Sequence, residues 1–221
     1  MPRGLAFALS LPGAIWCDLV RSPARQVQFC LDDEVDNSPA HLDAVNYGAI
    51  GAVIAHEITH GYDDQGRKFD DCGNIKDWWQ EEDAELFKAK TELMKKQAEQ
   101  YVYVDRENGT KHKMNGDLTM GENLADLGGM SLAVQALEER HKGSDAESTA
   151  RFLQLFFRSW ANVWKSKNTN ADNVKKLSTD PHAPPQFRAN LVKNVDSYYT
   201  AFGVEDGNPN FLPKELRVQM W

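Results

Sequence analysis

The chain has 221 residues, of which 41% are hydrophobic and 26% are charged, a composition ordinary for a globular protein with one core and room for a small satellite. Its 25 Lys and Arg against 33 Asp and Glu give a formal charge of −8. This charge argues against a nucleic-acid partner, because phosphate binding needs a basic face. No apolar run approaches the ~20 residues of a membrane helix, so no transmembrane segment is expected.

Cysteine usage does not identify a compartment. Three cysteines are too few for a disulfide framework and none forms a CxxC pair. The sequence leaves open whether two of the cysteines form one disulfide bridge or all three are free thiols. The first residues carry one Arg, a short apolar stretch and small residues, which only weakly imitate a secretory signal.

The first forty residues differ in character from the rest. They hold four of the nine prolines and show no helical period, so residues 1–40 are expected to be irregular or short extended pieces. Residues 41–221 are expected to form one domain. Its first element is the apolar run 42–61, which is long enough for a buried helix and ends at Gly61.

Further helical patterns follow along the chain. They are expected at about 78–103 with Asp77 as the N-cap, at 120–141, at 150–166 after a Ser144 or Asp145 cap, and at 192–202 just before Gly203. Turn-rich segments separate them at 63–74, 108–117 and 177–188, and the prolines of the last one exclude a regular helix. The predicted fold class is mainly α, an α+β arrangement with little strand.

The first helix carries the sequence His56-Glu57-Ile58-Thr59-His60, an HExxH motif. Residues i and i+4 share a helix face, so both imidazoles can reach one zinc ion at about 2.0–2.1 Å. Glu57 is offset from that face and can act as general base on a metal-activated water. The alternative is a chance pattern on a buried helix with no metal.

A third ligand is offered by the helix at 120–141. Glu122 and Asp126 are again i and i+4 and lie in an otherwise apolar segment. A buried carboxylate is costly unless it is neutralised. Glu122 on zinc and Asp126 hydrogen-bonded to a ligand histidine satisfy both acids. The alternative is two solvent-facing acids near a helix N-terminus.

At these residues the sequence resembles the neprilysin and endothelin-converting-enzyme family of zinc metallopeptidases. The resemblance covers about residues 42–221, in matching order. It rests on VNYGAIGAVIAHEITHGYDDQGRKFD, DWW, NGDLTMGENLADLGG, DPHAPPQFR and the closing Trp221. It implies a thermolysin-like zincin catalytic domain over residues 41–221, with one Zn²⁺ per chain and peptides as substrates.

The resemblance also implies individual roles. By this resemblance, the zinc ligands are expected to be His56, His60 and Glu122, and the catalytic base is expected to be Glu57. The acids that orient the ligand histidines are expected to be Asp126 and Asp63, the histidine that stabilises the oxyanion is His182, and the arginine that binds a substrate carbonyl is Arg188. The pocket for the residue after the scissile bond is expected to be lined by Val53, Val163 and Trp164. Considered alone, His182 reads as a solvent-exposed loop histidine and Trp164 as a core residue.

The sequence also departs from the family pattern. The sequence given is expected to lack the large helical lobe that precedes the catalytic region in family members, and residues 1–40 contain no match to the family's Asn-Ala-Tyr/Phe edge strand that pairs with substrate. Two readings follow: an endopeptidase that cleaves oligopeptides on the amino side of hydrophobic residues, or a zinc-binding fragment without turnover that lacks its lobe. A purely helical scaffold without metal is a third. The family suggests an extracellular or membrane-associated protein, and a cytoplasmic one stays open.

Overall fold

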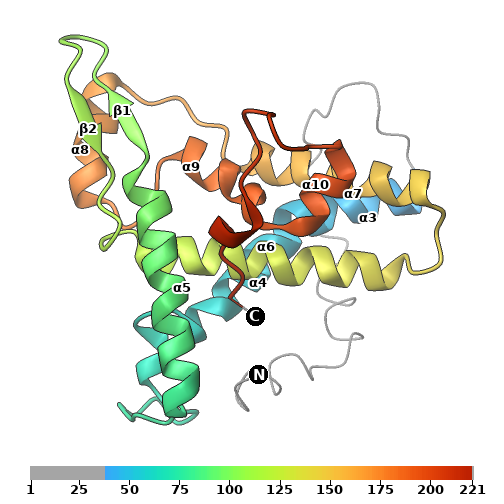
Figure 1. Ribbon diagram of the computed structural model, residues 1–221, viewed down its shortest axis with the longest axis horizontal. Helices are drawn as coiled ribbons and strands as arrows, with labels where there is room; N and C mark the ends of the chain where they lie inside the picture. Colours follow the sequence, from blue (N-terminus) through green and yellow to red (C-terminus); the bar gives the residue numbers. More distant parts are fainter. Residues whose placement is uncertain (1–37, 221) are drawn as a thin grey trace.

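The computed structural model describes residues 38–220 (Figure 1). Helices dominate this part of the chain, and the strands that it contains form one two-stranded antiparallel sheet. The mainly α class predicted from the sequence is therefore confirmed. The elements, in order, are α3 Pro39–Asn46, η1 Tyr47–Gly51, α4 Ala52–Thr59, η2 His60–Tyr62, η3 Gly66–Lys68, α5 Glu81–Glu99, β1 Val102–Val104, β2 Lys111–Lys113, α6 Met120–Arg140, α7 Ala146–Val163, α8 Asn170–Thr179, α9 Pro185–Asn190, η4 Leu191–Asn194, α10 Asp196–Phe202 and η5 Lys214–Leu216.

The expected helix at 42–61 is present but is not a uniform α-helix. It begins earlier, at Pro39, where the Ser38 side chain accepts a hydrogen bond from the backbone N–H of His41. Its middle turns, η1, are π-helical, a local widening that often lies next to functional sites. The expectation of an irregular segment over 1–40 is wrong for Pro39 and Ala40, which begin α3, whereas Ser38 before them is extended. Residues 1–37, with Cys17 and Cys30, fall outside the described residues.

Helix α5 is shorter than predicted. It begins at Glu81 and Gln80 is its N-cap residue, so Asp77 does not cap it. Trp78 stays in the preceding loop because its indole N–H donates to the carbonyl of Phe69 at 2.8 Å. At the other end the chain leaves the helix after Glu99 and forms the β1–β2 hairpin, in which Tyr103 faces His112.

Helices α4 and α6 lie against each other and carry the two motifs (Figure 1). Their backbones approach closely at Gly129, where a Cβ atom would stand 2.5 Å from the backbone nitrogen of His56 and 2.7 Å from the carbonyl oxygen of Ala52. Only glycine fits at such a contact. Gly48 plays the same part between η1 and α7, since a Cβ there would lie 2.2 Å from the carbonyl oxygen of Phe156.

Helix α7 and the chain beyond it complete the core. Asp145 caps α7 by accepting from the N–H of Ser148, and Gly203 ends α10 in the left-handed conformation at φ 60°, as predicted. The predicted irregular segment 177–188 is wrong at both ends. Helix α8 runs through Thr179, and α9 begins at Pro185, which fits the first turn of a helix because its missing N–H is not needed there.

Two hydrophobic clusters result. The main core is shared by α3, α6, α7, η4 and α10, and Trp160, Phe156 and Leu124 are fully buried within it. A satellite cluster of Ala98, Met114, Leu177 and Ala183 joins the end of α5, the hairpin and α8. Figure 1 shows α8 beside the hairpin at one end of the molecule. None of the described helices combines the length and apolarity needed to cross a membrane.

Candidate metal centre

Three potential ligand atoms converge between α4 and α6. The Nε2 atoms of His56 and His60 lie 3.0 Å apart, and the carboxylate oxygens of Glu122 lie 3.3 Å from His56 Nε2 and 3.6 Å from His60 Nε2. The helix repeat brings the two imidazoles to one face, and the close contact at Gly129 brings α6 against that face. The side chains form a group that could hold a metal ion.

A carboxylate holds the far nitrogen of each imidazole. Asp126 lies 2.9 Å from Nδ1 of His56, and Asp63 lies 2.7 Å from Nδ1 of His60. Asp63 is itself fixed, because its other oxygen accepts from the backbone N–H groups of Gln65 and Gly66. Such pairs orient a ligand histidine and leave Nε2 for a metal.

The protonation states of the histidines and carboxylates in this centre depend on one another. Burial lowers the pKa of the His56 imidazole, but its hydrogen bond with Asp126, its close contact with Glu122 and the charges of both acids outweigh burial and raise the pKa to about 9. The contact with His56 lowers the pKa of Glu122 against the effect of burial, and His182 acts in the same direction. Metal-free His56 is therefore protonated at neutral pH, and this proton must leave when a metal takes Nε2.

Asp126 also anchors an arginine. Its two carboxylate oxygens accept from Nε and Nη2 of Arg188, each at 2.6 Å. Asp126 is fully buried and Arg188 is 8% exposed. The guanidinium carbon lies 3.6 Å from the centre of the Trp164 ring, and the indole N–H of Trp160 donates to the Arg188 carbonyl. The arginine is thus held rigidly, and its Nη2 lies 3.9 Å from Glu122.

His182 approaches the centre from the loop between α8 and α9. Its Nε2 lies 3.4 Å from a Glu122 oxygen, and its Nδ1 lies 2.8 Å from Asp180. Asp180 also accepts from the backbone N–H of His182. Burial raises the pKa of Asp180, and both bonds from His182 outweigh it and lower the pKa below the usual value. The sequence analysis missed Asp180, although its position two residues before His182 is typical of an aspartate that binds a nearby backbone N–H.

A cavity of about 250 Å³ adjoins the candidate ligands, of which His56 lines it. It brings together most of the residues singled out in the sequence, and its lining is Val53, His56, Glu57, Asp126, Trp160, Val163, Trp164, His182 and Arg188. Glu57 is exposed, so its carboxylate is open to solvent at the edge of the cavity. Trp160 is the lining residue that the sequence analysis did not name. It is fully buried and lies one turn before Trp164 on the same helix face.

The ligand set fits zinc. Tetrahedral zinc separates two nitrogen ligands by about 3.3 Å, close to the 3.0 Å between the two Nε2 atoms. The buried oxygen Oε2 of Glu122 has no well-formed hydrogen bond among the described residues, and a buried acceptor of this kind needs a partner. Two imidazoles and one carboxylate also match a frequent ligand set of catalytic zinc.

The fold and this site define the class of the protein: a mostly helical protein with an HExxH motif and a candidate metal site completed by a glutamate from a second helix. Residues 35–218 match the model of peptidase family M13. The chain belongs to this family, and the family resemblance drawn from its motifs is confirmed.

Relatives and solved structures agree with this assignment. The chain is 42% identical over 174 residues to neprilysin-1 of Caenorhabditis elegans, covering 75% of this chain and 22% of that protein. It is 39% identical over 185 residues to endothelin-converting enzyme 1 of Mus musculus, covering 81% and 23%. Its fold superposes on the inhibitor complex of the zinc metalloprotease Zmp1 of Mycobacterium tuberculosis with a TM-score of 0.74 at 39% identity, covering 85% of this chain and 28% of that chain. The chain spans less than a quarter of these two curated relatives.

Proposed function

We propose that the chain is a zinc-dependent endopeptidase that binds one Zn²⁺ through His56, His60 and Glu122. The observation that carries the proposal is the convergence of these three ligand groups beside a cavity that also receives Glu57 and His182. Membership of peptidase family M13 supports it, and so does the solved relative described as a zinc metalloprotease.

The residues around the cavity divide the chemistry of amide hydrolysis between them. The zinc ion, when bound, supplies a Lewis acid. Glu57, exposed at the cavity, accepts a proton from the attacking water and passes it to the leaving amine. His182 donates to the oxygen of the scissile carbonyl as negative charge develops there. Asp180 keeps the His182 ring in place, since it holds Nδ1 and leaves Nε2 directed toward Glu122.

The lining of the cavity explains the proposed preference for cleavage before hydrophobic residues. Val53, Val163 and Trp164 provide apolar walls, and a hydrophobic side chain placed there is removed from water. Arg188 offers a rigid donor to the carbonyl of the same substrate residue, because Asp126 and Trp164 fix its guanidinium. A hydrophobic residue after the scissile bond therefore places the peptide for attack.

A second candidate function is zinc binding without turnover. Among residues 38–220 the regular strands are those of the β1–β2 hairpin, and neither lines the cavity beside the metal centre. A peptide substrate commonly gains binding energy from pairing with a strand. On this reading the helical lobe expected of full-length family members supplies what the chain needs for catalysis.

Cleavage of a mixed library of short peptides by the purified chain separates the two candidates. Cuts before hydrophobic residues that disappear with a zinc chelator and return with added zinc support the endopeptidase. One zinc per chain, measured by elemental analysis, without any cut contradicts it and supports the second candidate. The Glu57→Gln variant controls for contaminating peptidases, because it should bind zinc and cut nothing.

A further inference from the structure

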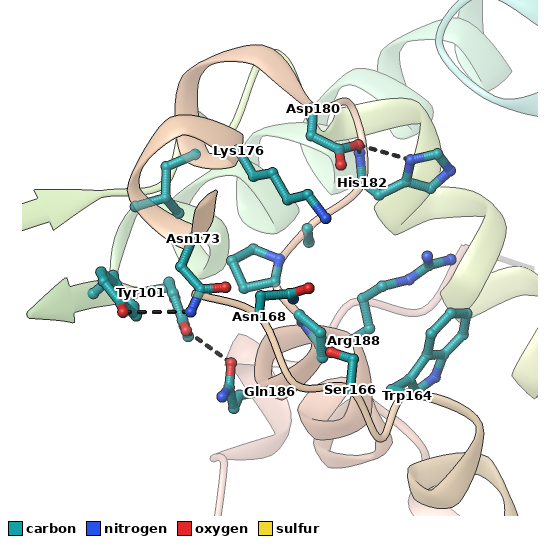
Figure 2. A pocket seen from close by; sticks show the side chains of 15 residues that line it. Tyr101, Trp164, Ser166, Asn168, Asn173, Lys176, Asp180, His182, Gln186 and Arg188 are labelled. Atoms are coloured by element: carbon teal, nitrogen blue, oxygen red, sulfur yellow. Dashed lines mark hydrogen bonds and ion pairs between the residues drawn. The ribbon is translucent and has the colours of Figure 1, made fainter. Parts of the chain in front are cut away.

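The third candidate ligand, Glu122, is supported differently from the other groups of the site. His56 and His60 are each held by an aspartate, and Figure 2 shows the same arrangement for His182, whose Nδ1 lies 2.8 Å from Asp180. The oxygens of Glu122 lie 3.3 to 3.6 Å from ring nitrogens of these three histidines, which belong to the site itself. The position of its carboxylate therefore depends on the backbone of the first turn of α6.

This turn lacks the usual side-chain cap. Helix α6 begins at Met120 with Thr119 as its N-cap residue, so Glu122 is the third residue of the helix. A threonine at the N-cap usually accepts a hydrogen bond from the backbone N–H of the second or third helical residue. Among the described residues Thr119 makes no such bond, and its hydroxyl instead donates to the carbonyl oxygen of Asn115 at 3.1 Å. Another contact must hold the turn.

Asn123, the residue after Glu122, supplies this contact. Its side chain is fully buried, and Thr119 is 2% exposed. The amide nitrogen Nδ2 of Asn123 donates to the hydroxyl oxygen of Thr119 at 3.0 Å. The backbone N–H of Asn123 also donates to the carbonyl of Thr119 at 3.0 Å. A hydrogen-bond relay therefore runs from Asn123 through Thr119 to Asn115 and spans the turn that carries Glu122.

The far end of this relay is fixed to α5. The side-chain oxygen of Asn115 accepts from the backbone N–H groups of Asp117 and Leu118, each at 3.1 Å. Asp117 pairs with Lys95 of α5 at 2.6 Å. Gly116 lies so close to α5 that a Cβ atom there would stand 3.1 Å from the carbonyl oxygen of Lys95. The relay thus connects the first turn of α6 to a neighbouring helix.

Core stability alone does not explain an amide at position 123. The carbonyl oxygen Oδ1 of Asn123 is buried and has no hydrogen-bond partner among residues 38–220. A buried acceptor without a partner destabilises a fold, and an apolar side chain of similar volume would avoid this cost. The bond from Nδ2 to Thr119 is what the amide contributes in exchange.

We propose that Asn123 is a positioning residue for the candidate zinc ligand Glu122, and that it acts through the hydroxyl of Thr119. The proposal rests on the proposed function and deepens it. Asn123 belongs neither to the group of candidate ligands nor to the cavity lining, so it touches neither metal nor substrate. Without the relay, the first turn of α6 loosens and the Glu122 carboxylate is no longer held at a fixed distance from the two imidazoles.

Zinc affinity, measured by competition with a fluorescent chelator, tests this role without turnover. Asn123→Leu and Thr119→Val each break the relay and nearly preserve side-chain volume. Each should weaken zinc binding by about tenfold or more, the effect of removing a group that orients a metal ligand. Because both act through one bond, the double variant should bind zinc no more weakly than the weaker single variant. Thr119→Ser keeps the hydroxyl and should retain the native affinity. Native affinity in both single variants, or losses that multiply in the double variant, overturn the proposal.

A control variant separates positioning from a general loss of stability. Leu137 is fully buried on the same helix, about four turns from Asn123. Leu137→Val should lower the free energy of unfolding and leave zinc affinity unchanged. The cobalt-substituted chain gives a second readout, since its visible absorption bands report the coordination geometry of the metal. These bands should change in Asn123→Leu and stay native in Leu137→Val. A native spectrum in Asn123→Leu contradicts the positioning role.

The result for Asn123 is separable from the result for peptide cleavage. Weaker zinc binding in Asn123→Leu, with no cleavage of peptides by the native chain, supports the positioning role and contradicts the endopeptidase function. Peptide cleavage by the native chain, with native zinc affinity in Asn123→Leu, contradicts the positioning role and supports the endopeptidase function.

Discussion

Asp126 and Arg188 form a buried two-point ion pair, and one oxygen of Asp126 also lies 2.9 Å from Nδ1 of His56. A single carboxylate on α6 therefore orients a candidate zinc ligand and a candidate substrate-binding group. Asp126 thus links the candidate metal centre to the lining of the neighbouring cavity, and a substitution at Asp126 should affect both.

Asp126→Asn should weaken zinc binding by about 10- to 100-fold, because the amide can no longer serve as the anionic acceptor that orients His56. It should also lower the free energy of unfolding of the metal-free chain by about 3–5 kcal/mol, since buried Arg188 loses its counter-charge. Competition with a fluorescent chelator measures the first effect and urea unfolding the second. Asp172→Asn, at a half-exposed acid on α8, is the control. Unchanged zinc affinity in Asp126→Asn would rule out the role assigned to Asp126.

Glu57 and Glu122 should separate catalysis from metal binding. Glu57 is exposed and belongs to no group of candidate ligands, so Glu57→Gln should retain one zinc per chain and lower the rate of peptide cleavage by a factor of 10²–10⁴ or more, the share of a general base. Glu122→Ala removes one of three ligands and should leave the chain without stoichiometric zinc after dialysis. Elemental analysis and peptide cleavage give both results. Full zinc content in Glu122→Ala removes Glu122 from the ligand set.

The sequence predicts the metal centre better than it predicts the surrounding structure, and the reason is physical. His56, His60, Glu122 and Asp126 are pairs at i and i+4, so the helix repeat alone places each pair on one face. That α4 and α6 face each other depends on the close contact at Gly129, which no local pattern reveals.

Contacts between residues that are distant in the sequence account for most of the differences between the predicted and the observed elements. Strand β2 is the polar sequence Lys111–Lys113 and has no apolar alternation, so only its pairing with β1 makes it a strand. Trp78 precedes α5 and bonds instead to the carbonyl of Phe69, nine residues earlier, a contact that the helical pattern around it does not reveal. The part played by Asp180 follows only once His182 is seen beside Glu122.

The titration of His56 gives a prediction for the metal-free chain. Its pKa is about 9 in the folded chain against an ordinary value of 6.5. Because the folded pKa is the higher one, protonated His56 stabilises the fold fully below pH 6.5, and this stabilisation is lost as the pH rises through 9. In the presence of a chelator, the ¹H–¹³C NMR signal of the His56 ring should titrate near pH 9. A midpoint near 6.5 contradicts the coupling to Asp126 and Glu122.

Zinc uptake should release the same proton. Below pH 9 the metal-free His56 carries it, and a metal on Nε2 displaces it. Calorimetric titration of zinc in buffers of different ionisation enthalpy should therefore give about one proton released per zinc near pH 7.5 from this residue. Zinc affinity should fall as the pH decreases from 9. An affinity independent of pH between 6 and 9 is the contrary result.

Gly129→Ala tests the packing that brings the two motifs together. The added Cβ would stand 2.5 Å from the backbone nitrogen of His56, and α4 cannot yield by a side-chain rotation because the contact is with backbone. Helices α4 and α6 must therefore move apart, which should cost about 1–3 kcal/mol of unfolding free energy and weaken zinc binding by displacing Glu122 from His56. Gly61→Ala is the matched control, because a Cβ there meets no atom within 4 Å. Urea unfolding and chelator competition on the two variants should separate them clearly, and equal zinc affinity in both would show that the metal centre does not depend on this close approach.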